Sequence, residues 1–171
     1  MSNRVTRAMA EGAAKQLTEA AYGQKIKDAE NERRDVGITL YEKYIPKEVR
    51  EAGETHIDVY DSTCYLKFLP EGGSSYDKIE ISYYQLNKYF PRVKPIILKI
   101  EDWKALRKVE DSLKRLKDER SQYSDEVEQA LVNLRTEKNV REQFPEALPY
   151  MNFTTCTALV PNIDKLRLKL K

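Results

Sequence analysis

The sequence predicts an α+β fold with a helical N-terminus, a small antiparallel sheet, and a long helix or helical hairpin. Residues 3–52 and 102–144 are rich in helix-forming residues and carry apolar side chains at steps of three or four. Between them, residues 55–100 alternate apolar and polar side chains, which is typical of half-buried strands. A short terminal element is expected over residues 152–171. Because the chain is close to the usual domain size, we predict one domain over residues 1–171.

Composition and charge narrow the class of protein. The chain is 40% hydrophobic and 34% charged, with a mean hydropathy of -0.71, which is typical of a protein with a heavily charged surface. No stretch approaches the roughly 18 consecutive apolar residues of a membrane span, and the N-terminus lacks the apolar core of a secretory signal. We therefore expect a cytoplasmic protein without a membrane partner. The net charge of +2 indicates no general attraction to nucleic acid.

The N-terminal region is predicted to form helical segments followed by a short turn. Gly23 is expected to interrupt the first helical pattern, and a charged helix should follow it. A further helical segment should end before Pro46, because proline removes a backbone donor and restricts the residue before it. Pro46 then begins a short turn that Gly53 closes. The face of the first helix is predicted to comprise Val5, Met9, Ala13, Leu17 and Ala20 or Ala21.

The middle segment is predicted to form an antiparallel hairpin. Its first strand ends at PEGGSS, where Gly72 and Gly73 supply the positive φ angles of a turn. The second strand covers residues 78–84, and residues 94–100, after Pro95, form a third strand or lead into the long helix. The apolar face of the hairpin is predicted to comprise Ile57, Val59, Cys64, Leu66, Phe68, Ile79 and Ile81.

The segment from residue 102 runs to Phe144 without glycine or proline before Pro145 stops it. A continuous helix of this kind would be about 45–60 Å long, which is long for a domain of this size. We favour a chain reversal at SQYSDE, where Ser121 or Ser124 could cap a second helix. The alternative is one helix that pairs with a second copy, giving a homodimer through residues 106–134. Its seam would be Leu106, Val109, Leu113, Leu116, Arg120, Tyr123, Val127, Ala130 and Leu134, with Arg120 as the one charged member.

The residue inventory excludes several kinds of catalytic site. His56 is the only histidine, and Cys64 and Cys156 are far apart in the sequence, so a multi-histidine or paired-cysteine metal site is excluded. No phosphate-binding glycine loop occurs. We predict that the chain is not an enzyme and has no cofactor and no metal site. A magnesium-dependent nuclease is kept as a third hypothesis. The nuclease would use Asp58, Asp61 and Glu80 with Lys67 and Lys78.

Eleven tyrosines are the unusual feature of the composition, and six lie in the middle segment. Tyrosine is enriched at binding surfaces because it combines a large apolar area with a polar tip. The candidate partner-binding residues are Tyr60, Tyr65, Tyr83, Tyr84 and Arg120. Basic residues offer an alternative, nucleic-acid-binding surface. These are Lys114, Arg115 and Lys117 in the long helix and Lys165, Arg167, Lys169 and Lys171 at the end.

Two segments of the chain resemble a known family. They are LVNLRTEKNVREQFPEALPYM, with the block Phe144-Pro145-Glu146-Ala147, and the closing ALVPNIDKLRLKL. They resemble small bacteriophage proteins called the fifth nucleotide modification associated domain family, in which tryptophan is more usual at the position of Phe144. The resemblance covers about a third of the chain and implies no catalytic residues. It implies a phage accessory protein in the cytoplasm of an infected bacterium.

The leading hypothesis is accordingly a non-enzymatic phage protein that binds a host protein, as a counter-defence or host-takeover inhibitor. The alternative is a nucleic-acid-binding accessory of phage DNA modification.

Overall fold

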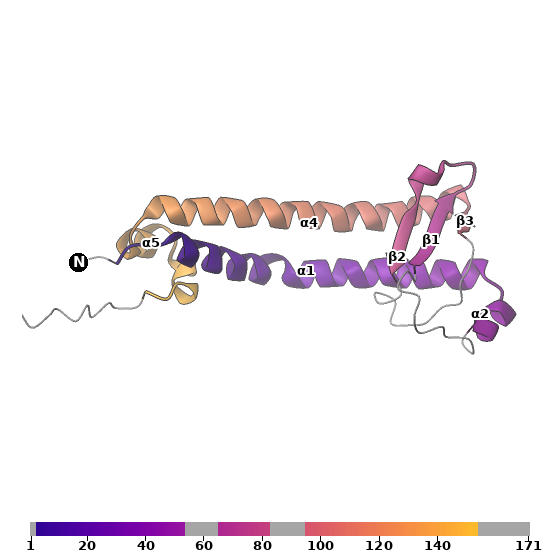
Figure 1. The fold of residues 1–171 in the computed structure, drawn as a ribbon, viewed down its shortest axis with the longest axis horizontal. Coiled ribbons are helices and arrows are strands. Elements are labelled where there is room, and N and C mark those ends of the chain that lie inside the picture. The colour runs from indigo at the N-terminus through magenta and orange to yellow at the C-terminus, as the bar shows by residue number, and fades with distance from the viewer. Residues whose placement is uncertain (1–2, 54–64, 83–94, 154–171) are drawn as a thin grey trace, which may run out of the picture. The chain divides into compact units, whose positions relative to one another are not determined.

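A computed structural model describes residues 3–53, 65–82 and 95–153 (Figure 1). The contacts within the chain divide it into two compact units. Unit 1 comprises Met1–Ala21 and Arg120–Lys171, and unit 2 comprises Tyr22–Glu119. Two long helices, α1 (Arg7–Tyr44) and α4 (Ile100–Leu134), each contribute residues to both units. The predicted α+β class is confirmed.

Helix α1 begins where the Thr6 hydroxyl accepts a hydrogen bond from the Met9 N–H (3.2 Å), as in an N-cap. It ends at Tyr44, before Pro46, and the short helix α2 (Lys47–Gly53) follows, as the proline and glycine signals predict. The expected break at Gly23 is wrong, because α1 continues through it and Gly23 is buried. A glycine costs a helix only about 1 kcal/mol relative to alanine, and burial of the surrounding face offsets that cost.

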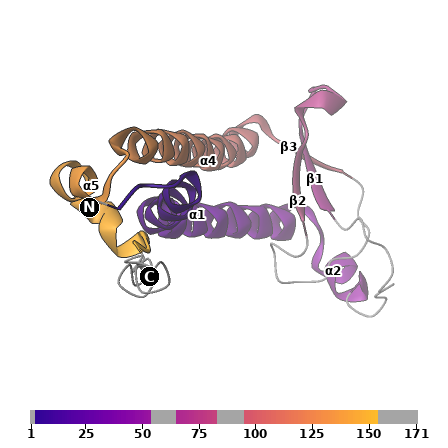
Figure 2. The ribbon, with the colours of Figure 1, turned by 60° about the vertical axis from the view of Figure 1, so that its left-hand side comes forward.

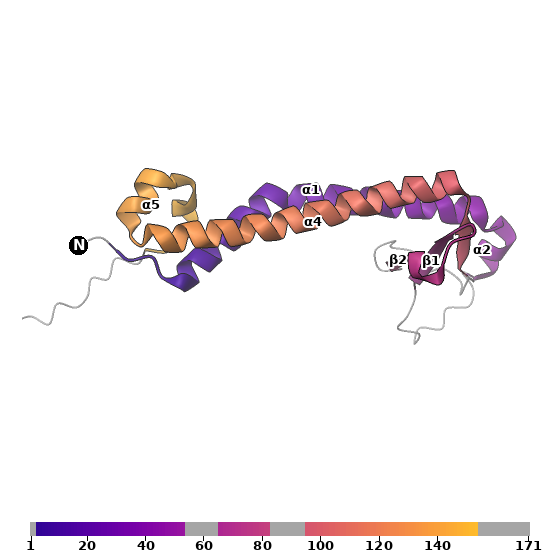
Figure 3. The ribbon, with the colours of Figure 1, turned by 90° about the horizontal axis from the view of Figure 1, so that it is seen from above.

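Helix α4 is a single helix, so the favoured chain reversal at SQYSDE is wrong. Ser121 and Ser124 lie inside it. The helix continues because apolar residues on both sides of these serines keep the same phase, and each set is buried in its own unit. In unit 2, Lys117 Nζ lies 2.9 Å from a Glu30 carboxylate oxygen, whereas Asp102 lies beside Lys43, so α1 and α4 are antiparallel there, as Figure 3 shows.

Unit 2 contains a three-stranded mixed sheet in the order β2-β1-β3 (Figure 2). Strands β1 (Tyr65–Pro70) and β2 (Ile79–Ser82) are antiparallel, as predicted, whereas β3 (Ile96–Leu98) is parallel to β1, so the prediction of a purely antiparallel sheet is wrong for this strand. One face of the sheet packs against apolar residues of α1 and α4. This core comprises Leu40, Tyr41, Leu66, Phe68, Ile79, Ile81, Ile96, Leu98 and Leu106.

The turn after β1 uses its two glycines for different reasons. Gly72 has a φ of 70°, as predicted. Gly73 does not have a positive φ; a Cβ atom added to it would lie 2.3 Å from Pro70 Cγ, so this position needs glycine for space. A short 3₁₀ helix, η1 (Ser75–Asp77), follows, and the Ser74 hydroxyl accepts from the Tyr76 N–H.

Unit 1 packs the first part of α1 against the end of α4 and the short helices α5 (Glu137–Gln143) and η2 (Pro145–Tyr150). One predicted position of the α4 seam is wrong here, because Leu131 is fully buried and the predicted Ala130 is exposed. The core of unit 1 comprises Ala10, Ala13, Ala14, Val127, Leu131, Val140, Ala147 and Met151.

Helix α4 ends at a turn that the sequence did not predict. Arg135 has a φ of 61°, its carbonyl accepts from the Val5 N–H (2.9 Å), and the Thr136 hydroxyl caps α5. The predicted helix to Phe144 is therefore two helices. None of the helices in the described ranges is long and apolar enough to cross a membrane.

Candidate partner-binding surface

The sheet of unit 2 has a second face, whose side chains point away from the core, and we call it the outer sheet surface. It follows from strand alternation, because residues on either side of each buried strand residue face the opposite way. Across the strands, Tyr65 lies opposite Ser82, Lys67 lies opposite Glu80, and Leu69 lies beside Ile97. The outer sheet surface thus comprises Tyr65, Lys67, Leu69, Glu80, Ser82 and Ile97.

Two large apolar side chains on this surface are strongly exposed. Ile97 is 59% exposed and Tyr65 is 44% exposed, whereas their strand neighbours Ile96, Leu98 and Leu66 are buried. Tyr76 in η1 and Ile100 at the start of α4 are also exposed and flank the same strands in the sequence. Exposed apolar side chains gathered on one surface indicate a binding site, whereas the same side chains scattered singly are normal on any protein.

The polar part of the outer sheet surface is a small ion-pair group. Glu80 lies 3.1 Å from Lys78 Nζ and 3.6 Å from Lys67 Nζ. The hydrogen bond from Lys78, followed by the attraction of both ammonium groups, holds the pKa of Glu80 below its usual value. Glu80, Lys67 and Lys78 were the described members of the nuclease hypothesis, and here the single carboxylate of Glu80 pairs with both lysines.

Arg120 has a partner within unit 1, where its guanidinium lies 2.9 Å from a Glu19 carboxylate oxygen of α1. The α4 seam therefore packs against the same chain, and its buried residues are already covered. The basic residues nearby are exposed. Lys117 pairs with Glu30 (2.9 Å), Arg115 pairs with Glu119 (3.7 Å), and Lys114 forms no ion pair within the described part of the chain. Of the predicted partner-binding residues, Tyr65 is placed on the outer sheet surface and Arg120 is not.

The other predicted site residues lie outside the described ranges. They are Tyr60, Tyr83 and Tyr84 of the partner-binding set, and Lys165, Arg167, Lys169 and Lys171 of the nucleic-acid-binding set. The same holds for His56, Asp58 and Asp61.

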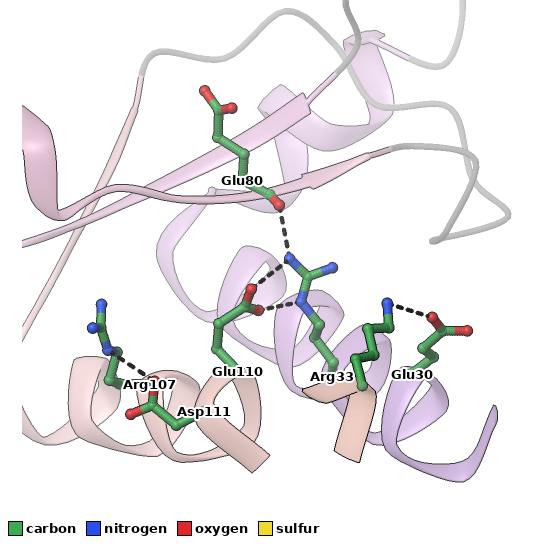
Figure 4. Close-up of polar contacts among 7 residues, drawn as sticks. Glu30, Arg33, Glu80, Arg107, Glu110 and Asp111 are labelled. Atoms are coloured by element: carbon green, nitrogen blue, oxygen red, sulfur yellow. Dashed lines mark hydrogen bonds and ion pairs between the residues drawn. The ribbon is translucent and has the colours of Figure 1, made fainter. Parts of the chain in front are cut away.

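A buried arginine that sequence reasoning did not single out holds the sheet to the helices in unit 2. Arg33 is only 8% exposed. Its Nε and Nη2 atoms donate to the Glu110 carboxylate, and Nη2 also donates to the Glu80 carbonyl at 2.9 Å (Figure 4). One side chain thus joins α1, α4 and β2. The burial of Arg33 could have been predicted from the sequence, because Arg33 follows Ile26 and Ala29 at helical spacing on the buried face of α1.

A second polar group joins the end of α1 to the start of α4. Lys43 Nζ donates to both Asp102 carboxylate oxygens (2.9 and 2.8 Å), and the Tyr44 hydroxyl donates to Asp102 at 2.6 Å while accepting from the Lys99 N–H at 2.9 Å. The hydrogen bonds from Lys43 and then Tyr44 lower the pKa of Asp102. The hydrogen bond to Asp102 raises the pKa of Lys43 and that of Tyr44.

Within residues 3–53, 65–82 and 95–153, no three histidine, cysteine or acidic residues are grouped so as to hold a metal ion. Comparison with family models, with curated proteins and with solved structures found no match. The resemblance to the phage family therefore stays a prediction from the quoted segments.

Proposed function

We propose that this chain is a non-enzymatic phage accessory protein that binds a host protein through the outer sheet surface. The observation that supports the proposal is the pair of exposed apolar side chains, Tyr65 and Ile97, on the face of the sheet that points away from its core. The resemblance to phage proteins suggests a bacterial partner. A counter-defence or host-takeover inhibitor working in the host cytoplasm fits both considerations.

The energetics of this surface suit a protein interface. Complete burial of an isoleucine is worth about 1.5–3 kcal/mol, so covering the 59% of Ile97 that remains exposed would contribute about 1–2 kcal/mol. Tyr65 offers a rigid apolar ring with a hydroxyl that can donate or accept. The charged side chains of Lys67 and Glu80 beside them would form a polar rim, which protein interfaces commonly have.

A pull-down from bacterial lysate, with and without nuclease treatment and read by mass spectrometry, tests the proposal. We expect one dominant host protein to be captured even after nuclease treatment. The amount captured should fall at least about tenfold with Ile97→Glu, since a carboxylate buried in the interface without a partner is costly. Val132→Glu is the matched control, because Val132 is also apolar and 41% exposed but belongs to α4 of unit 1. Circular dichroism checks that both variants keep their helices. Equal capture by the two variants would refute the role of the outer sheet surface.

The nuclease arm addresses the alternative of a nucleic-acid-binding accessory. Retention of nucleic acid, or of proteins only through it, would replace the proposal, and binding should then weaken steeply between about 50 and 200 mM salt. Ion pairs at Arg115 and Lys117 reduce the positive charge that α4 offers to phosphates.

A further inference from the structure

Unit 2 has an open groove of about 590 Å³ along α1 and the start of α4. Its apolar lining is formed by Val36, Leu40 and Ala105. The polar residues that line it are Asp28, Asn31, Glu32, Asp35, Thr39 and Asp102.

The charged side chains that line the groove are all negative. All four ionisable side chains that line it are carboxylates, although the whole chain carries a net charge of +2. Three of them, Asp28, Glu32 and Asp35, follow one another at steps of four and three on α1, so they form one stripe along the helix. The three carboxylates span about 10 Å, or two helical turns, and the lining on α1 continues to Thr39.

Internal cations satisfy only part of this charge. Asp102 is paired with Lys43, and Asp35 lies 3.3 Å from Arg34 Nε. Within the described part of the chain, Asp28 receives a hydrogen bond only from the neutral Gln24 amide (2.8 Å), and Glu32 has no ion-pair partner. The groove therefore presents uncompensated negative charge beside apolar side chains.

We infer that this groove binds a basic amphipathic helix of the partner protein, which deepens the proposed function and rests on it. Aliphatic side chains of such a helix would cover Val36 and Ala105, while its lysines or arginines would face Asp28 and Glu32. The groove is lined by α1 and the start of α4, and its carboxylates repeat at helical spacing over two turns of α1, which matches the regularity of a helix docked in a groove. The negative charge of the side chains that line the groove would repel an acidic occupant.

A peptide titration tests the groove without knowledge of the partner. The probe is a fluorescent helical peptide of leucine, alanine and lysine, about 14 residues long, and its control carries glutamate in place of lysine. Fluorescence anisotropy should show saturable binding of the lysine peptide only. Glu32→Lys should weaken it about fivefold, since an attraction becomes a repulsion at an exposed site. Glu11→Lys, the same exchange at an exposed position of α1 in unit 1, should leave the affinity unchanged.

Three outcomes would overturn the inference. The first is no saturable binding up to about 1 mM peptide, and the second is an equal effect of Glu32→Lys and Glu11→Lys, which would mean that only net charge matters. The third is a gain of about tenfold in peptide affinity when the chain is truncated after Asn162, because the basic end of the chain itself, or of a second copy, would then be the occupant.

The same variants separate this inference from the proposed function. If Ile97→Glu abolishes capture of the host protein while Glu32→Lys leaves it unchanged, the groove inference fails and the proposed function stands. If no host protein is captured but the peptide binds and depends on Glu32, the proposed function fails and the charge selectivity of the groove stands.

Discussion

Removing the Glu110 carboxylate should destabilise unit 2 more than removing the arginine that it binds. Arg33 has a side chain only 10% exposed, whereas that of Glu110 is 33% exposed. Glu110→Ala takes a carboxylate away from a buried guanidinium and should cost about 3 kcal/mol. Arg33→Met leaves a carboxylate that water can reach, and the methionine keeps much of the apolar stem, so we expect a cost of about 1–2 kcal/mol.

The double variant sharpens this prediction. Arg33→Met combined with Glu110→Ala buries no charge, so it should be more stable than Glu110→Ala alone. Urea unfolding followed by the fluorescence of Trp103 measures the effect, because Trp103 is the only tryptophan and packs against the core of unit 2. Circular dichroism at the helix wavelengths is the parallel probe. A Glu110→Ala cost below about 1 kcal/mol, or a double variant less stable than Glu110→Ala, would refute the reasoning.

Four further outcomes are expected. Phe68→Ala should cost about 3–5 kcal/mol in unfolding followed by Trp103, since Phe68 is fully buried; a cost under about 1 kcal/mol would contradict this core. Asp102→Asn should destabilise the protein at neutral pH. Because the folded pKa of Asp102 is lowered, the difference from wild type should shrink as the pH falls below about 4, and a constant difference in melting temperature across pH would contradict the ion pair. Arg120→Leu should leave the melting temperature unchanged or raise it, because the exposed Arg120 ion pair contributes at most about 1 kcal/mol. Arg135→Gly should stabilise by about 0.5–1 kcal/mol, since glycine adopts a positive φ without strain, and a lower melting temperature would count against the described turn.

Local signals were sufficient where one residue type decides the backbone. Pro46 ends α1, Gly72 takes a positive φ, and alternation assigns Leu66 and Phe68 to the buried face of β1. These features were predictable because each depends on the geometry of a few neighbouring residues. The exposure of Tyr65 followed from the same alternation.

Features that depend on distant contacts were not predictable in this way. The turn after α4 uses arginine at a position where glycine is usual, and the backbone bonds from Val5 to Arg135 and from Glu137 to Asn3 hold it. The parallel direction of β3 likewise results from pairing with β1, which no local pattern encodes. In an isolated helix, Gly23 would favour a break. In the folded chain the burial of this part of α1 stabilises the helix by more than the glycine costs.

Arg120 shows how the long helix can be continuous without a second chain. Its apolar neighbours along the seam divide into two sets: Leu113 and Leu116 belong to a core of unit 2, and Tyr123 and Val127 belong to the core of unit 1. Arg120 belongs to neither core and pairs with Glu19 instead. A charged residue is therefore tolerated in the seam because it falls where no apolar core is being filled. The regularly spaced apolar residues that suggested a homodimer seam pack against α1 of the same chain. Dimer formation through residues 106–134 would therefore require a different face of α4.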